Sequence, residues 1–205
     1  EVDNFPGYPQ GIDGPTMMNE LKEQAERFGT KVEIDFISKV DFSKDKGGIH
    51  KLYTQNGDEI KSKTVIISTG ASAKYLGLPS EQRLIGGGVS ACAVCDGFFY
   101  KNQDVAIVGG GDTAIEEATY LAKICTNVTM LVRKDHFRAS KAMQNRLSNF
   151  DNIKVLFNHE VEEVIGENVV DGLKIKNNLT NEISELKITG LFIAIGHSPN
   201  TDILK

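Results

Sequence analysis

This 205-residue sequence has few cysteines, no positive net charge and no long apolar run. Its three cysteines are too few for the disulfide framework of a small secreted protein. The formal net charge of −5 argues against a nucleic-acid-binding protein, because contact with phosphates requires a basic surface. No apolar run is long enough to cross a bilayer, so we expect neither nucleic acid nor a membrane among the partners.

The ends of the sequence lack the usual marks of a complete chain. Residues 1–7 (EVDNFPG) contain neither an initiator methionine nor the basic and apolar stretches of a secretory signal peptide. The sequence stops at Lys205, within an unfinished segment. We therefore expect a cytoplasmic protein, of which this sequence is the middle part.

The first part of the sequence predicts one helix followed by a small β layer. Gly14-Pro15 begins a stretch with helical spacing of apolar residues, and Gly29 ends it. Three strands with a hairpin turn are expected after the helix, the strands at 32–40, 50–54 and 63–69 and the turn at 56–58.

After residue 90 the pattern changes to apolar strands that alternate with amphipathic helices. Strands are expected at 105–108, 128–132 and 154–157, and helices at 113–124 and 140–147. This order predicts an α/β fold with a parallel, doubly wound sheet of the Rossmann type. A β meander at 159–188 and a final buried strand at 191–196 are expected to follow.

A glycine-rich turn lies between the strand at 105–108 and the helix after it. It reads Gly109-Gly110-Gly111-Asp112-Thr113-Ala114. Gly109 permits a tight turn, Gly111 lets the backbone approach a pyrophosphate, and Ala114 allows close packing of helix on strand. The helix N-terminus adds unpaired N–H groups and the positive end of its dipole. We therefore predict a dinucleotide site; the alternative is a purely structural turn.

The segment after the next strand indicates which dinucleotide is preferred. A site for NAD usually has Asp or Glu there, which binds the ribose 2′-hydroxyl. This sequence has Arg133, Lys134 and Arg138 instead. Basic side chains pair with a 2′-phosphate, so we predict NADPH rather than NADH; the alternative is a solvated basic patch.

Two of the three cysteines form the motif Cys92-Ala93-Val94-Cys95, which Asp96 follows directly. Cysteines at this spacing can form a disulfide and stabilise a thiolate, and Asp96 could serve as general acid and base. The alternative, half of a zinc site, lacks the further clustered ligands that would complete it, so no metal is predicted. Cys125 ends the apolar face of a helix and is interpreted as core packing.

A dinucleotide site and a redox disulfide in one chain leave a chemical gap. NADPH delivers a hydride, which a disulfide does not readily accept directly, and a flavin normally mediates this transfer. The sequence contains no second dinucleotide fingerprint for FAD. We expect that fingerprint to belong before residue 1.

Six motifs extend these observations along the chain: EVDNFPG at 1–7, YLGLPSE at 75–81, GVSACAVCDGFFY at 88–100, VGGGDTA at 108–114, RKDHFR at 133–138 and IGHSPNT at 195–201. Together they strongly resemble the bacterial low-molecular-weight thioredoxin reductases, over essentially the whole sequence. The resemblance implies an NADPH-dependent, FAD-containing enzyme that reduces thioredoxin and forms a homodimer. It also implies that residues 1–72 are part of an FAD domain and that 73–205 form the NADPH domain.

The resemblance also implies roles for single residues. Cys92 and Cys95 would be the redox pair, with Cys95 nearer the flavin and Asp96 the proton carrier. Phe98 and Phe99 would contact thioredoxin, unless they pack in the core. The positions that match flavin contacts are Asn4, Val40, Thr69 and Gly70. The positions that match contacts with NADPH are Gly110, Gly111, Thr113, Arg133, Lys134, Arg138 and Gly196.

A rotation between the two domains is implied as well, with hinge strands at 86–88 and near 199–201.

Two residues depart from the pattern. Lys134 replaces a usual arginine, which keeps the charge and loses the bidentate fork. Asp112 replaces a usual asparagine, and we expect its carboxylate to weaken pyrophosphate binding slightly. The flavin fingerprint and the C-terminal Gly-Asp segment are absent, so we expect flavin to be held poorly.

Two other functions remain open from the sequence. The flavin subunit of an alkyl hydroperoxide reductase shares the C-x-x-C-D motif and the glycine-rich turn, but it lacks the basic motif and favours NADH. A non-catalytic NADPH-binding or redox-sensing module is the second alternative. Bound flavin would distinguish an enzyme from such a module.

Overall fold

The computed structural model describes residue 2 and residues 5–204. The chain divides into two compact units, one formed by 1–68 with 201–205 and the other by 69–200. The chain therefore passes between the units twice, after residue 68 and after residue 200. Among the described residues, no helix combines the length and apolarity needed to cross a bilayer.

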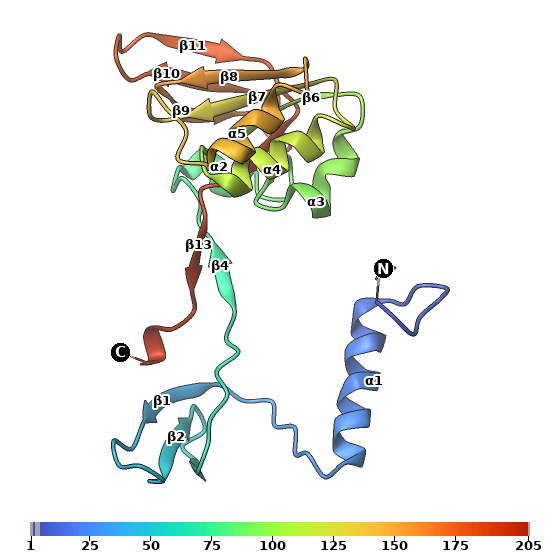
Figure 1. Ribbon diagram of the computed structural model, residues 1–205, viewed down its shortest axis with the longest axis vertical. Helices are drawn as coiled ribbons and strands as arrows, with labels where there is room; N and C mark the ends of the chain where they lie inside the picture. Colours follow the sequence, from blue (N-terminus) through green and yellow to red (C-terminus); the bar gives the residue numbers. More distant parts are fainter. Residues whose placement is uncertain (1, 3–4, 205) are drawn as a thin grey trace. The chain divides into compact units, whose positions relative to one another are not determined.

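The first unit contains one helix and one small antiparallel sheet (Figure 1). Helix α1 (Gly14–Arg27) begins where the Asp13 carboxylate accepts a hydrogen bond from the Thr16 N–H at 3.1 Å, with proline in the first turn. Strands β1 (Ile37–Asp41), β2 (His50–Thr54) and β3 (Glu59–Ser62) pair in sequence order. The helix and the three-stranded layer predicted from the sequence are both present.

The third strand of this sheet was placed wrongly, at 63–69. A tight turn at Gly57, whose φ is +96°, closes the hairpin at once, so Glu59 already pairs with Tyr53 and Ser62 with His50. The apolar residues 65–67 therefore come after the sheet, and Ile66 is 92% exposed. The apolar pattern at 63–69 is typical of a strand, but the position of the turn at Gly57 determines that residues 59–62 pair with β2.

The second unit is built on a five-stranded parallel sheet with the order β5-β12-β6-β7-β8. Helices α4 (Asp112–Leu121) and α5 (Lys141–Leu147) lie on one face of this sheet, as Figure 1 shows. An antiparallel sheet, β9 (His159–Ile165), β10 (Gly172–Asn177) and β11 (Ile183–Leu186), covers the other face. The sheet strands are β5 (Val89–Ser90), β6 (Asp104–Val108), β7 (Asn127–Val132), β8 (Ile153–Phe157) and β12 (Gly190–Ile193).

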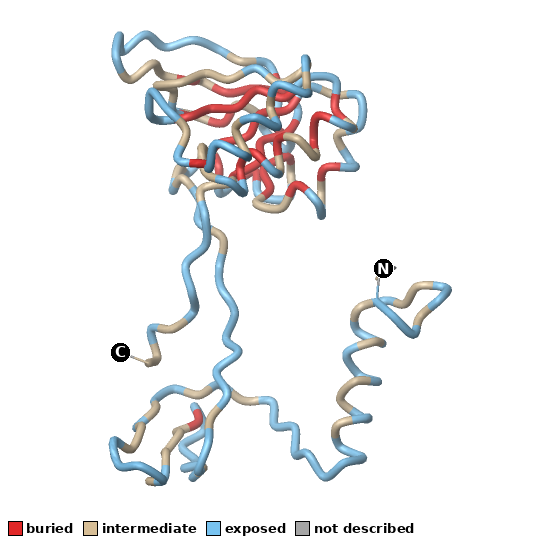
Figure 2. The backbone as a smooth tube through the Cα atoms, viewed as in Figure 1, coloured by how far each residue is buried: buried red, intermediate tan, exposed pale blue. Residues whose placement is uncertain are grey.

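Alternate residues of β6 belong to two separate hydrophobic cores. Val105 and Ile107 pack with α4, whereas Ala106 and Val108 pack with the antiparallel sheet. Figure 2 shows that the buried residues gather along these central strands and the helix beside them. The predicted α/β class with a parallel sheet is confirmed.

Two short segments form the entry and exit of the second unit. Strands β4 (Ala71–Ala73) and β13 (His197–Pro199) pair antiparallel, although the paired residues are 124 to 128 positions apart in the sequence. Asn200 extends this pairing by two hydrogen bonds. Its backbone N–H donates to the Gly70 carbonyl at 3.0 Å, and its side-chain Nδ2 donates to the Thr69 carbonyl at 3.1 Å.

The hinge predicted at 86–88 is wrong, whereas the one near 199–201 lies at a crossing point between the units. Gly88 is buried inside the second unit, and a Cβ there would lie 2.7 Å from the Val170 side chain. The Gly87 carbonyl accepts a hydrogen bond from the Val170 N–H at 2.8 Å. These glycines permit close packing on the antiparallel sheet, and the first crossing follows residue 68 instead.

Candidate functional site

The glycine-rich turn connects β6 to α4 in a conformation that excludes larger residues. Gly109 has φ +151°, and a Cβ on it would lie 2.4 Å from the Ala194 carbonyl oxygen and 2.7 Å from the Ala114 side chain. Ala114 is fully buried, so the turn brings the start of α4 directly against β6 and β12. The turn therefore has the close packing that a dinucleotide-binding fingerprint requires.

The turn is also bonded to the basic segment that follows β7. The Gly110 carbonyl accepts hydrogen bonds from the Arg138 N–H at 2.7 Å and from the Ala139 N–H at 3.0 Å. The Asp112 Oδ1 accepts from the Ser140 N–H at 2.9 Å and from the Ser140 hydroxyl at 3.0 Å. Asp112, expected only to disturb a pyrophosphate, thus has a structural role: it fixes the basic segment to the turn.

A cavity of about 760 Å³ opens at this point, entirely within the second unit. Its wall contains the glycine turn, the start of α4, the basic segment and the residues after β12. The structure brings together there every residue expected to contact NADPH: Gly109, Gly110, Gly111, Asp112, Thr113, Arg133, Lys134, Arg138 and Gly196.

The basic side of the cavity carries three cationic side chains that form no ion pair within the described part of the chain. These are Arg133, Lys134 and Arg138, and all three are exposed. The neighbouring Asp135 instead bonds to the His136 ring, which lowers the pKa of its carboxyl group through the hydrogen bond and the ring's charge. The cavity therefore presents cations to an anionic group.

Part of the cavity wall was missed by the sequence interpretation. Leu76, Leu78 and residues 159–161 line it, from segments distant in sequence from the glycine turn. Glu81 holds the first of these segments, because its fully buried carboxylate accepts from the Leu76 N–H at 2.9 Å and from the Gly77 N–H at 2.8 Å. Glu81 was part of the motif recognised at 75–81, but only the fold shows that its carboxylate binds the backbone of residues 76 and 77.

The two cysteines lie at the start of helix α3 (Ala93–Asp96), directly after β5, and they form a disulfide. Cys95 is exposed and Cys92 is half-buried. The Cys92 Sγ also accepts a hydrogen bond from the Cys95 N–H at 3.2 Å. Because both thiols are used in this bond, the structure supports the redox interpretation over half of a zinc site.

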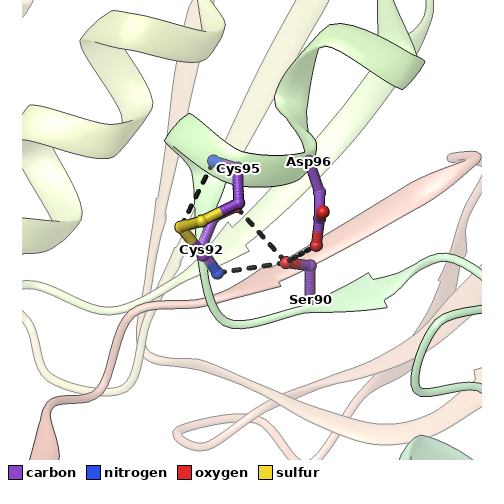
Figure 3. The surroundings of a disulfide bond; sticks show 4 residues. All are labelled: Ser90, Cys92, Cys95 and Asp96. Atoms are coloured by element: carbon purple, nitrogen blue, oxygen red, sulfur yellow. Dashed lines mark hydrogen bonds between the residues drawn. A yellow bond between two sulfur atoms is a disulfide. The ribbon is translucent and has the colours of Figure 1, made fainter. Parts of the chain in front are cut away.

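Ser90 connects the disulfide to Asp96, and the sequence interpretation did not assign it a role (Figure 3). Its buried hydroxyl donates to the Asp96 Oδ2 at 2.6 Å and accepts from the Cys92 N–H at 3.0 Å. The half-buried carboxylate of Asp96 is therefore held beside the cysteine motif. Its charge, after the effect of burial, also raises the pKa of Tyr100 on the next turn, η1 (Gly97–Tyr100).

The disulfide and the glycine turn lie at the same edge of the parallel sheet. The cysteine motif follows β5 and the glycine turn follows β6, with β12 between these two strands. Because all three strands run parallel, both motifs extend from their carboxyl ends, where α/β proteins generally bind ligands. Neither cysteine lines the cavity itself.

The residues expected to contact flavin are divided between the two units. Val40 is half-buried on β1 in the first unit, whereas Thr69 and Gly70 are exposed at the start of the second. Neither unit by itself brings these residues together. Asn4 lies outside the described residues.

Three further residues complete the comparison with the sequence. Phe98 and Phe99, which were expected to contact a partner or to pack in the core, are 68% and 74% exposed, so they do not pack in the core of this unit. Cys125 is buried, and burial, with a smaller effect of the Asp104 charge, raises the pKa of its thiol to about 11. This supports its interpretation as core packing.

The fold and the two motifs agree with the result of comparison against known families. The profile of the family described as pyridine nucleotide-disulphide oxidoreductase matches residues 5–205. The chain belongs to this family. Its name refers to a pyridine nucleotide and to a disulfide, and this unit carries a glycine-rich strand–helix turn and a disulfide.

Individual relatives are similar over nearly all of the chain. The thioredoxin reductase of Streptomyces coelicolor is 48% identical over 205 residues, which cover 100% of this chain and 63% of the relative. The thioredoxin reductase of Giardia duodenalis has a solved structure with a TM-score of 0.79 and 35% identity, covering 98% of this chain and 65% of that chain. A protein of Pseudomonas fluorescens named glucosaminate ammonia-lyase is 48% identical over 211 residues, 100% of this chain and 64% of its own length. The chain thus spans just under two thirds of the length of these relatives.

Proposed function

We propose that this chain is the coenzyme-binding and disulfide-carrying part of an NADPH-dependent thioredoxin reductase. One observation carries the proposal: the Cys92–Cys95 disulfide and a cavity lined by basic residues extend from the same edge of one parallel sheet. Relatives of nearly equal similarity carry two different activity names, so similarity alone does not decide the activity. The exposed redox disulfide favours the reductase.

The cavity fits a phosphorylated dinucleotide by the chemistry of its wall. The glycine turn leaves no side chain between the backbone and a pyrophosphate, and the first residues of α4, whose N–H groups have no partner within the helix, line the cavity. Arg133, Lys134 and Arg138 supply positive charge for a 2′-phosphate. NADPH would supply a hydride there, and the residues of this chain would bind and orient it.

At the disulfide, the chain's own residues would manage the protons. Reduction breaks the bond between the two sulfur atoms, takes up two electrons and, when both thiols form, two protons. Asp96, held by Ser90 at 2.6 Å, would deliver and accept one of these protons as the pair cycles. Cys95 is the more exposed of the two cysteines, and Phe98 and Phe99 provide apolar surface near it for the partner, thioredoxin.

FAD would mediate between the hydride donor and the disulfide, with residues 1–72 as part of its domain and 73–205 as the NADPH domain. Val40, Thr69 and Gly70 would contact it, but the fit of these residues to a flavin is not defined within either unit. A cytoplasmic homodimer is part of the same proposal. The basic segment argues against an NADH-preferring hydroperoxide reductase subunit.

The test is a visible spectrum of the purified chain before and after anaerobic addition of NADPH, followed by addition of oxidised thioredoxin. We expect NADPH to bind in preference to NADH. Where flavin is retained, we expect its band to bleach and to recover with thioredoxin in the wild type but not in Cys95→Ser. Absence of a nucleotide preference, or unchanged turnover in Cys95→Ser, would refute the proposal.

A further inference from the structure

Glu117, on α4, carries a buried oxygen that the proposed chemistry leaves unexplained. Its Oε2 is shielded from solvent and has no hydrogen-bond partner in the described part of the chain. It borders the buried face of α4 formed by Ala114, Ala118 and Leu121. A buried, unsatisfied carboxyl oxygen costs stability, so its presence calls for a reason.

The Glu117 carboxyl group is near the peptide that follows Cys92. The Ala93 N–H lowers the pKa of this carboxyl group, against the effect of burial. Ala93 is fully buried, packs in one cluster with Ala114, Ala118 and Leu121 of α4, and is the first residue of α3, where the helix itself provides no acceptor for its N–H. Glu117 is therefore placed to act on the first peptide group after Cys92.

Close packing fixes this arrangement. Helix α3 packs on α4, and a Cβ on Gly97 would lie 3.0 Å from Leu121 and 3.2 Å from Tyr120. Tyr120 and Leu121 stand one helical turn after Glu117, so the same side of α4 supports the whole cysteine motif. Movement of the motif relative to Glu117 would require this packing to open.

We propose that Glu117 is a positioning residue for the Cys92–Cys95 pair, whose carboxyl group holds the peptide after Cys92 and makes the disulfide–dithiol equilibrium depend on its proton. This inference rests on the proposed redox role of the pair. The anionic form repels a thiolate formed next to it, so it disfavours the reduced state. The neutral form has no such effect, and a proton taken up by Glu117 therefore favours reduction.

The surroundings support a proton equilibrium at this residue. Burial raises the pKa of the Glu117 carboxyl group; the Ala93 N–H opposes this effect, and the Glu116 charge adds to it. Other titratable groups are present on α4 and on the elements near it: Asp112, Glu116 and Tyr120 on α4, Asp96 on α3, Tyr100 on η1, Asp104 on β6, and Lys141 and Arg146 on α5. Among charged groups, Glu116 is the one that acts on this pKa.

The experiment is a redox titration of the whole chain with mixtures of reduced and oxidised dithiothreitol, over a pH series from mildly acidic to alkaline. Each dithiothreitol molecule becomes a cyclic disulfide as it passes two electrons and two protons to Cys92–Cys95. We expect Glu117→Gln to match the wild type at acidic pH. At alkaline pH it favours the dithiol by roughly tenfold, the equivalent of one pKa unit.

Two variants separate charge from structure. Glu116→Gln removes the same charge from the exposed neighbouring residue and should leave the wild-type pH dependence. Glu117→Leu removes the acceptor as well as the charge and should change the equilibrium at every pH. Equal titrations of Glu117→Gln and wild type at all pH values, or an equal shift from Glu116→Gln, would overturn the inference.

The failure of the proposed function would look different. A wild-type disulfide that does not equilibrate with dithiothreitol would contradict the redox role itself. If Glu117→Gln does not fold, a reduced-minus-oxidised infrared difference spectrum of Asp96→Asn decides instead. We expect a change in the carboxyl C=O band from Glu117; a flat spectrum would overturn the inference.

Discussion

The Ser90 hydroxyl donates a hydrogen bond of 2.6 Å to the Asp96 carboxylate, across the loop that carries both cysteines. The same hydroxyl accepts from the Cys92 N–H at 3.0 Å. One buried serine therefore links the proposed proton carrier to the backbone of the disulfide. Ser90 therefore fixes where the Asp96 carboxylate lies relative to the cysteine motif.

We predict that Ser90→Ala releases the Asp96 carboxylate from its place beside the cysteine motif, because the carboxylate loses this donor. The rate at which iodoacetamide modifies Cys95 in the reduced chain should therefore change at constant pH. Loss of a hydrogen bond to a charged group should also lower the free energy of unfolding by about 1.5–3 kcal/mol.

A double-mutant cycle provides the control for Ser90. If Ser90 acts through Asp96, Ser90→Ala should change the rate of Cys95 modification little in a chain that already carries Asp96→Asn. An undiminished effect in that background would show that Ser90 acts on the cysteines by another route.

The coenzyme preference gives a second prediction. Arg133→Ala and Arg138→Ala should each weaken NADPH binding by roughly 1.5–3 kcal/mol, because each removes a charge-assisted contact with the 2′-phosphate. NADH binding, which lacks that phosphate, should change much less. Isothermal titration calorimetry of both coenzymes measures the two losses separately.

Arg146 on α5 is a matched control, because it is exposed and has the same charge but does not line the cavity. Arg146→Ala should leave both affinities unchanged at physiological salt. Equal losses for NADPH and NADH in the Arg133 and Arg138 variants would contradict the assignment of the 2′-phosphate.

Asp112 gives a third prediction, which adds a structural role to the expectation from the sequence. Its Oδ1 accepts from both the N–H and the hydroxyl of Ser140, so Asp112→Ala should release the segment that carries Arg138 from the glycine turn. Asp112→Asn keeps the acceptor oxygen and removes a negative charge, so it should bind NADPH at least as tightly as the wild type. Hydrogen exchange at the Arg138 and Ala139 amides, both bonded to the Gly110 carbonyl, reports the release directly.

The two variants discriminate between the roles of Asp112. Faster exchange and weaker binding in Asp112→Ala alone would support the structural role. Tighter binding in both variants would show that charge repulsion, as first expected, is the main effect of this carboxylate.

Local patterns were sufficient for the glycine turn and for the strand and helix that flank it. The apolar strand before Gly109 and the helix after it are adjacent in sequence, so their order alone predicted the turn and its packing. The pairing of β4 with β13 could not be predicted, because Ser72 and Asn200, which bond to each other, are 128 positions apart in the sequence. For the same reason the hinge was placed at glycines that pack inside the unit.

The cysteine motif shows the same limit. Cys92, Cys95 and Asp96 were recognisable from spacing, since their chemistry depends on neighbours in sequence. The role of Glu117 is visible only when α4 packs on α3, and nothing in an ordinary helical glutamate indicates it beforehand. Residues that act through tertiary contacts are therefore the ones that a single sequence leaves unassigned.

Cys125 provides a final prediction, on stability against pH. Burial raises the pKa of its thiol to about 11, above the ordinary value of 9.0 that it regains in the unfolded chain. The folded state therefore holds the proton more tightly. This contribution to stability is intact below the unfolded pKa and is lost as the pH rises toward the folded one. We expect the free energy of unfolding to fall by at most about 2–3 kcal/mol through this residue as pH increases over that range.

Cys125→Ala should lower the free energy of unfolding at neutral pH by leaving a cavity. The further loss of stability at alkaline pH should be smaller in this variant than in the wild type. Urea unfolding at a series of pH values measures both, and parallel losses in the two chains would show that Cys125 does not ionise with the predicted shift.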